Sequence, residues 1–194
     1  MEMLEGEIMG DYCSVASLKS YRDIAAGTKD SLLSDMINAA EQYIDTATKR
    51  HFRIKKVSWR LFDPVADVES DTLLLDYDMV KDSWIVNGDG STVAVADRIL
   101  LTRNSPPYWG IKLRRGSWKT SGDIRVRAWW GYSRKAPQDI VQATRRLAAY
   151  LFAQKDSQVF EVASFYEGGI LTIPEGVPAF VQKVINKYTR AGVA

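Results

Sequence analysis

The chain has 194 residues, of which 46% are hydrophobic and 26% are charged, a balance typical of a folded globular protein and not of a disordered one. Its net charge of only +2 does not indicate a general binder of polyanions. The single cysteine, Cys13, excludes an internal disulfide and a cysteine-rich zinc site. No stretch reaches the ~18 apolar residues that span a bilayer, and the acidic start does not resemble a secretory signal. We therefore expect a protein that folds in the cytoplasm without membrane contact.

The first fifty residues have the pattern of two helices. Ser14 is a suitable N-cap for a short helix through Ile24, which Gly27 would end. A longer helix is expected to begin at Asp30 or Ser31, because apolar residues then recur at alternating steps of three and four. Such spacing places them on one helical face. This face consists of Leu33, Ile37, Ala40, Ile44 and Ala47.

From about residue 55 to 132 the period changes to that of strands. Residues 57–61 alternate apolar and polar side chains, as a half-buried strand does. Residues 87–90, Asn-Gly-Asp-Gly, are a strong turn signal. Six or seven short strands with hairpin turns predict an antiparallel sheet or a small barrel. Further strands are expected at 72–75, 83–86, 93–95, 98–102, 109–113 and 123–129.

The last region is helical again. Pro137 suits the first turn of a helix, whereas residues 155–176 have no helical period and indicate a long loop or extended arm. A final amphipathic helix has an apolar face of Phe180, Val181, Val184, Ile185 and Tyr188. The whole pattern predicts an α+β fold, with a helical bundle from residues 1–54 and 133–194 and an inserted antiparallel β region at 55–132.

The sequence offers little for catalysis or metal binding. The only histidine, His51, lies beside basic residues at a predicted helix end, so serine or cysteine catalysis and a histidine metal site lack the partners they need. Carboxylate pairs such as Asp76 with Asp78 are better explained as surface charge than as acid–base groups. We therefore expect no enzymatic activity, no metal and no cofactor.

Charge is segregated within the β region. Residues 63–89 are rich in acids, including Asp76, Asp78 and Asp82, whereas residues 112–135 are basic with interleaved tryptophans and a tyrosine. The basic stretch fits a subunit interface, a platform for single-stranded nucleic acid, or an ordinary solvated face, and we favour the interface. Its candidate contact residues are Arg114, Arg115, Lys119, Arg125, Arg127 and Arg134.

The two charged stretches suggest a joint hypothesis. An acidic and a basic patch on one subunit can meet between neighbouring copies, and such heterologous contacts form closed rings when the rotation allows it. Reversing the charges of Arg125 and Arg127 would then abolish assembly.

Six passages form a distinctive series along the chain: residues 12–19, 30–52, 72–76, 83–88, 130–143 and 173–190. The most distinctive part is Trp130-Gly-Tyr132-Ser followed by Pro137-Gln-Asp-Ile140. In this order the passages resemble the head–tail connector family of tailed phages, also called head-completion or adaptor proteins. The resemblance covers nearly the whole chain.

The resemblance implies a virion neck protein. Such proteins form a ring of about twelve copies beneath the portal, extend the DNA channel with loose, sequence-independent passage of duplex DNA, and support a stopper or tail-completion protein. They use no cofactor. In this family role, Phe180, Val181, Val184, Ile185 and Tyr188 are candidates for docking on the portal.

Overall fold

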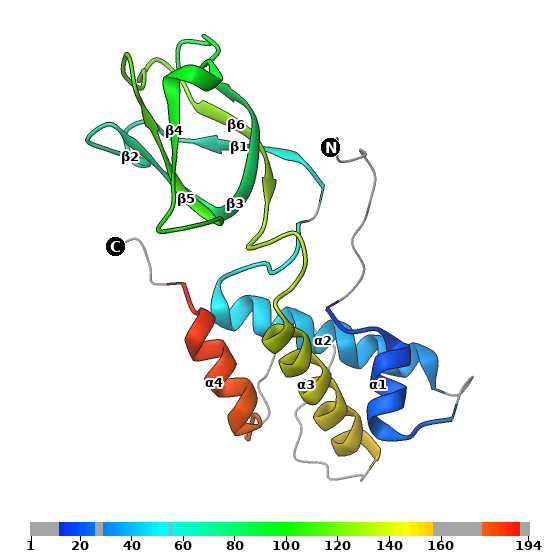
Figure 1. Ribbon diagram of the computed structural model, residues 1–194. Coiled ribbons are helices and arrows are strands. Elements are labelled where there is room, and N and C mark those ends of the chain that lie inside the picture. Colours follow the sequence, from blue (N-terminus) through cyan, green and yellow to red (C-terminus); the bar gives the residue numbers. More distant parts are fainter. Residues whose placement is uncertain (1–11, 26–28, 55, 157–175, 191–194) are drawn as a thin grey trace. The chain divides into compact units, whose positions relative to one another are not determined.

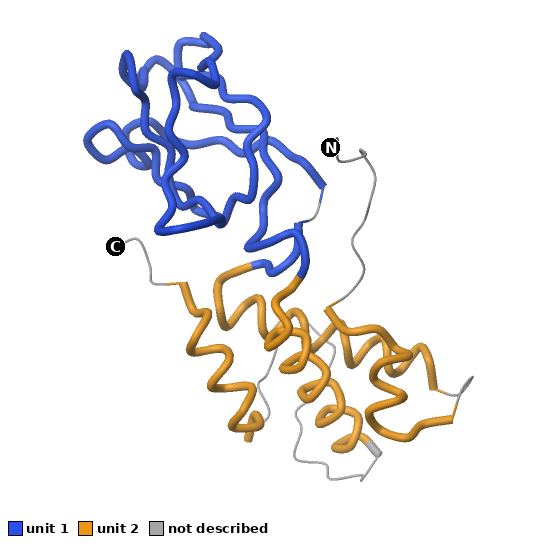
Figure 2. Tube along the Cα trace, viewed as in Figure 1, with its two compact units in different colours: residues 1–9, 51–135 blue, residues 10–50, 136–194 orange. Residues whose placement is uncertain are grey.

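The computed structural model describes residues 12–25, 29–54, 56–156 and 176–190. These residues form two compact units (Figure 2). Unit 1 contains His51–Lys135 and is inserted into unit 2, which joins Gly10–Arg50 to Ala136–Ala194. Unit 1 extends slightly beyond the predicted 55–132 because the backbone N–H of Tyr132 donates to the carbonyl oxygen of His51, 2.7 Å away.

Unit 2 is helical. Its described helices are α1 (Val15–Arg22), α2 (Asp30–Thr48), α3 (Gln138–Asp156) and α4 (Ala179–Tyr188), seen in Figure 1. The predicted cap of α1 is confirmed, since Ser14 Oγ accepts a hydrogen bond from Ser17 N at 3.1 Å. The predicted extension of α1 to Ile24 is wrong, because Asp23 adopts a left-handed conformation with φ of 53° and ends the helix. Gly27 lies outside the described residues.

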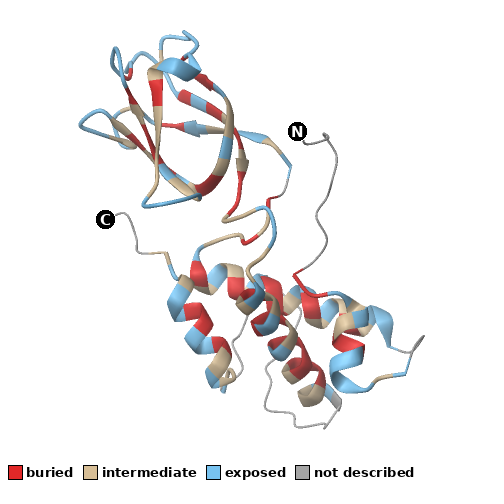
Figure 3. Cartoon of the chain, in the orientation of Figure 1, coloured by how far each residue is buried: buried red, intermediate tan, exposed pale blue. Residues whose placement is uncertain are grey.

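The helices of unit 2 bury their apolar faces against one another (Figure 3). The face predicted for α2 is buried from Leu33 to Ile44. At the end of the helix the buried residue is Thr48, and not Ala47 as predicted. Thr48 tolerates burial because its hydroxyl donates to the carbonyl oxygen of Ile44 at 2.7 Å. The buried residues of α3 include Ile140, Ala143, Leu147 and Leu151.

Unit 1 is a curled antiparallel sheet (Figure 1). The strands are β1 (Ser58–Phe62), β2 (Val68–Glu69), β3 (Thr72–Val86), β4 (Arg98–Leu101), β5 (Tyr108–Leu113) and β6 (Ile124–Trp130). The order is β1-β6-β3-β5-β4, with β2 paired to β3. The predicted α+β fold class is thus confirmed.

The long strand β3 organises this sheet. Its first half pairs with β2 and β5, and its second half pairs with β6, with register shifts between Met79 and Lys81 and between Asp82 and Trp84. Bulges of this kind bend a strand, which lets one strand serve both halves of a curled sheet. The enclosed core includes Phe62, Leu73, Leu75, Met79, Ile85, Ile111, Ile124 and Val126.

Three strand predictions need correction. Residues 72–75 and 83–86 belong to the single strand β3, because the bulged backbone continues through the polar residues between them. Residues 93–95 do not form a strand, since only Val86 and Thr92 make an isolated bridge there and Val95–Asp97 form a 3-10 turn. The two-residue strand β2 was not predicted because it is too short to show a period.

An ion pair is enclosed in unit 1. The Asp82 carboxylate lies 2.5 Å from Arg98 Nη2, and their side chains are 12% and 6% exposed. Arg98 Nη1 also donates to the carbonyl oxygen of Val93 at 2.9 Å. A buried pair of this kind contributes little net stability, but removing one partner leaves an uncompensated charge.

The substitution Arg98→Met should therefore destabilise unit 1 by about 3–5 kcal/mol, because the Asp82 carboxylate would stay buried without its counterion. Chemical unfolding followed by tryptophan fluorescence measures this change. The double variant Arg98→Met with Asp82→Leu should recover much of the loss. An Arg98→Met variant as stable as the wild type would contradict the account.

Candidate functional site

No group of side chains suited to a metal ion is found in the parts of the chain that the structure describes. His51 stacks on Tyr77, with ring centroids 5.3 Å apart and His51 Nε2 3.1 Å from the tyrosine hydroxyl. Within residues 12–25, 29–54, 56–156 and 176–190, no three His, Cys, Asp or Glu side chains are grouped as a metal site would need. None of the described helices has both the length and the apolar character needed to cross a bilayer.

The outer surface of three neighbouring strands carries an unusual group of side chains. The strand register places Arg127 of β6 between Trp59 of β1 and Trp84 of β3. Two residues before Arg127 on β6, Arg125 lies opposite Leu61 of β1. Two residues after Arg127 on β6, Trp129 lies opposite Lys81 of β3, whose Nζ is 5.3 Å from the centre of the indole. We name this the Trp–Arg face: Trp59, Leu61, Lys81, Trp84, Arg125, Arg127 and Trp129.

The Trp–Arg face exposes large apolar groups. Trp59 is 49% exposed, Trp84 is 51% exposed and Leu61 is 64% exposed. A folded protein usually covers tryptophan, so exposed tryptophans gathered on one strand surface indicate a contact surface. Tryptophan and arginine are also the residues that most often dominate binding energy in protein interfaces.

The outward position of Trp59 and Leu61 reverses what the alternation of residues 57–61 suggests. The inward residues of β1 are Arg60 and Phe62. Arg60 can lie inward because its guanidinium is 3.5 Å from the centre of the Tyr77 ring and pairs with Asp76 at 2.7 Å. The local signal against the alternation was Phe62, a second apolar residue directly after Leu61 and the buried one of the two.

Five of the six predicted basic residues fall into two groups, and Arg134 lies apart from both. Arg125 and Arg127 belong to the Trp–Arg face, whereas Arg114, Arg115 and Lys119 are exposed in the connection between β5 and β6. Arg134 is exposed near the end of unit 1.

A side-chain network holds the β5–β6 connection. Asn87 Oδ1 accepts from Lys119 N at 2.8 Å, and Asn87 Nδ2 donates to the carbonyl oxygen of Ser117 at 3.1 Å. Gly88 is required beside this network because a Cβ there would overlap with the carbonyl oxygen of Lys119. These hydrogen bonds order the connection, and they involve no aromatic residue of the Trp–Arg face.

Two of the three predicted acidic contact residues, Asp78 and Asp82, are enclosed in unit 1, whereas Asp76 is exposed. Asp78 is only 5% exposed, Asp82 pairs with Arg98, and Asp76 pairs with Arg60. Burial therefore removes Asp78 and Asp82 from the candidate interface, contrary to the surface role expected from the acid-rich sequence. The exposed acids of this region are Asp63, Glu69, Asp71, Asp76 and Asp89.

The apolar face predicted for the last helix is largely used within unit 2. Val181, Val184 and Ile185 are 0%, 5% and 3% exposed. Phe180 lies under the Arg146 guanidinium, 4.2 Å from the ring centre, and the Tyr188 hydroxyl donates to Asp139 at 2.9 Å. Most of this face therefore stabilises the helical unit and is not open to a partner. Apart from Ala179, the exposed side chains of α4 are polar: Gln182, Lys183, Asn186 and Lys187.

The substitution Ile185→Ala should lower the stability of unit 2 by about 2–5 kcal/mol, because it opens a cavity in a packed core. Lys183→Ala on the exposed side of α4 is the matched control and should change stability little. Thermal unfolding followed by circular dichroism compares the two. If Ile185→Ala left the isolated protein fully stable, the packing role of this face would be contradicted.

Asp139 links α3 to α4 through a charged contact. Its carboxylate accepts from Lys187 Nζ at 2.6 Å and from the Tyr188 hydroxyl. Burial opposes ionisation of Asp139, but these hydrogen bonds outweigh it, so the pKa of Asp139 is lowered. Burial and the hydrogen bond to Asp139 raise the pKa of Tyr188.

Because the pKa of Asp139 is lower in the folded state, its carboxylate stabilises the fold at neutral pH and loses this effect as the pH falls through the folded-state value. We expect Asp139→Asn to be less stable than the wild type at pH 7. The difference in free energy of unfolding between the two proteins should shrink when the pH falls below about 4, the ordinary pKa of an aspartate. Urea unfolding across pH measures it, with exposed Asp35→Asn as the control. A difference that is constant with pH would contradict this role.

Comparisons with known proteins identify relatives by fold. No protein-family model matches the sequence, and no curated protein matches it. A chain in the neck of a native gene transfer agent (GTA) particle, with C12 symmetry, aligns at 18% identity and a TM-score of 0.59 over 99% of this chain and 98% of that chain. A chain in the neck of an empty GTA particle, with C6 symmetry, aligns at 18% identity and a TM-score of 0.59 over 91% and 90%.

A third solved structure, the virion of a native GTA particle, contains a chain that aligns at 17% identity and a TM-score of 0.58 over 99% of this chain and 98% of that chain. At these identities the likeness shows a shared fold. The alignments span both units, and the shared fold is consistent with the resemblance to head–tail connectors.

Proposed function

We propose that this protein is a structural subunit of a virion neck and that it assembles into a ring. The supporting observation is that its fold, over 99% of the chain, is that of a chain in the neck of a particle with C12 symmetry. The Trp–Arg face supports the proposal independently, because a subunit that works by contacting other subunits needs exposed contact surface. In this role the protein is not an enzyme.

The finer role follows from the resemblance to connectors. The ring would lie beneath the portal, extend the channel for DNA and offer a platform for the stopper or tail-completion protein. Contact with the duplex would be loose and independent of sequence, because the DNA must slide through. Since Val181, Val184 and Ile185 are buried, any portal contact made by α4 falls to its exposed polar residues.

A second candidate function has one observation in its favour. Exposed tryptophans beside arginines also form platforms on which the bases of single-stranded nucleic acids stack. The Trp–Arg face would then bind oligonucleotides, and the affinity would fall steeply as salt is raised. The modest net charge of +2 and the fold of the neck proteins favour the structural function.

The ring proposal predicts a closed species of about a dozen subunits in solution at high protein concentration. Sedimentation velocity over a concentration series measures this mass. A chain that stays monomeric up to about 1 mM would contradict the proposal, because even a contact of about −4 kcal/mol would populate oligomers there.

A further inference from the structure

The Trp–Arg face has a surface of matching chemistry elsewhere on unit 1. Residues 63–71, which connect β1 to β3 and include β2, carry four carboxylates and no basic residue. We name them the acidic loop. Its carboxylates are Asp63, Asp67, Glu69 and Asp71.

We propose that the acidic loop of one copy docks on the Trp–Arg face of the next copy. This inference rests on the ring function proposed above and names the contact that would build the ring.

The acidic loop presents an apolar residue among its charges. Val65 is 77% exposed. A valine surrounded by carboxylates matches a surface on which indole rings are interspersed with cationic side chains. Asp71 already pairs with Lys112 of the same chain, 3.0 Å away. Val65 can cover apolar area of Trp59 and Trp84, while the other three carboxylates meet Arg125, Arg127 and Lys81.

The acidic loop is held in one conformation before any contact forms. Asp63 N donates to Asp67 Oδ2 at 2.7 Å, Val65 N donates to Asp63 Oδ1 at 2.8 Å, and Asp67 N donates to the carbonyl oxygen of Asp63 at 2.8 Å. Leu74 N on β3 also donates to the carbonyl oxygen of Asp67 at 2.8 Å. A preordered loop loses little conformational entropy on binding, which favours its use as a contact element.

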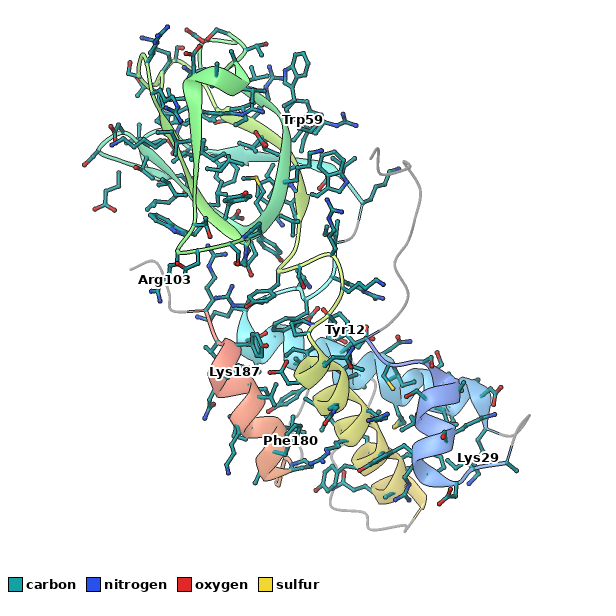
Figure 4. The ribbon with its side chains drawn as sticks, in the orientation of Figure 1. Tyr12, Lys29, Trp59, Arg103, Phe180 and Lys187 are labelled. Atoms are coloured by element: carbon teal, nitrogen blue, oxygen red, sulfur yellow. The ribbon has the colours of Figure 1, made fainter. Side chains whose placement is uncertain are left out.

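The two surfaces lie on different sides of unit 1. In Figure 4, Trp59 lies to the right of the sheet, whereas β2 lies at the left edge of the same unit in Figure 1. One copy can therefore offer its acidic loop to one neighbour and its Trp–Arg face to another. Such a head-to-tail contact closes into a ring when the rotation between copies allows it.

The same chemistry explains why a second copy fits better than a nucleic acid. The Trp–Arg face carries three cationic side chains, and the chain itself supplies carboxylates on a rigid loop. Val65 adds an apolar contact that a phosphate backbone does not supply. Nucleic-acid binding is the alternative that the test below distinguishes.

Two variants test the contact. The face variant, Arg125→Glu with Arg127→Glu, reverses charge on the Trp–Arg face. The loop variant, Val65→Lys with Glu69→Lys, removes one of the four carboxylates of the acidic loop and adds two lysines. The side chains of Val65 and Glu69 make none of the hydrogen bonds that hold the loop. Each variant has a control elsewhere on the surface of unit 1. Arg114→Glu with Arg115→Glu is the control for the face variant. Val95→Lys is the control for the valine substitution in the loop variant, because Val95 is 75% exposed.

We expect each variant alone to lose the ring, whereas both controls keep it. An equimolar mixture of the face and loop variants should associate again, at least as 1:1 dimers, because the unaltered loop of the face variant can meet the unaltered face of the loop variant. Sedimentation velocity measures the masses, and near-ultraviolet circular dichroism verifies that each variant is folded.

The outcomes separate this inference from the function on which it rests. If the wild type forms rings and the folded variants do so equally well, the contact is wrong but the ring function stands. A mixture that yields no dimers overturns the direct contact. A face variant that assembles but no longer binds a single-stranded oligothymidine supports the nucleic-acid alternative. A wild type that is strictly monomeric overturns both the function and the contact.

Discussion

The inward position of Arg60 determines what unit 1 presents to its surroundings. Its guanidinium lies between the Tyr77 ring, 3.5 Å from the centroid, and the Trp130 ring, 5.2 Å away. Side chains alternate between the two faces of a strand, so an inward Arg60 requires outward Trp59 and Leu61. A slip of one residue would bury both and remove the Trp–Arg face. The candidate contact surface thus depends on a cationic side chain made tolerable inside the unit by aromatic rings and by Asp76.

The charged residues of unit 1 serve two different purposes. Asp82 and Arg98 form an enclosed ion pair, and Asp76 neutralises Arg60. Of these two pairs only Asp82–Arg98 is buried, and a buried pair adds little net stability but is costly to break. Among the charges outside, one group of cations lies among the tryptophans of the Trp–Arg face and one group of carboxylates lies in the loop at residues 63–71. This arrangement gives a subunit two unlike surfaces, which is what a head-to-tail assembly requires.

The sequence predicted much of the architecture because periodicity reports burial. The α2 face from Leu33 to Ile44, the Ser14 cap and the alternation in β6 all follow from local patterns that the structure retains. The errors arise where tertiary contacts override local ones. The outward Trp59 depends on Tyr77 and Trp130, which are distant in sequence, and the continuity of β3 depends on bulges that only its partner strands define.

The candidate site was less predictable for the same reason. Arg125 and Arg127 could be identified by their alternation, but their neighbours Trp59 and Trp84 come from strands whose register no local pattern reveals. Asp78 and Asp82 were expected at the surface because they belong to an acid-rich stretch. Composition does not show that Asp82 would form a buried ion pair with Arg98. The α4 residues were correctly placed on one face, yet the pattern alone could not say whether that face meets the protein's own core or a partner.

The central claim is that this chain builds a closed ring, and electron microscopy of single particles of the purified assembly tests it most directly. The account predicts rings with a central channel wide enough for duplex DNA, in which the Trp59 surface of each copy is covered by the residue 63–71 loop of its neighbour. Particles that are not closed rings, or open filaments without a channel, would contradict it.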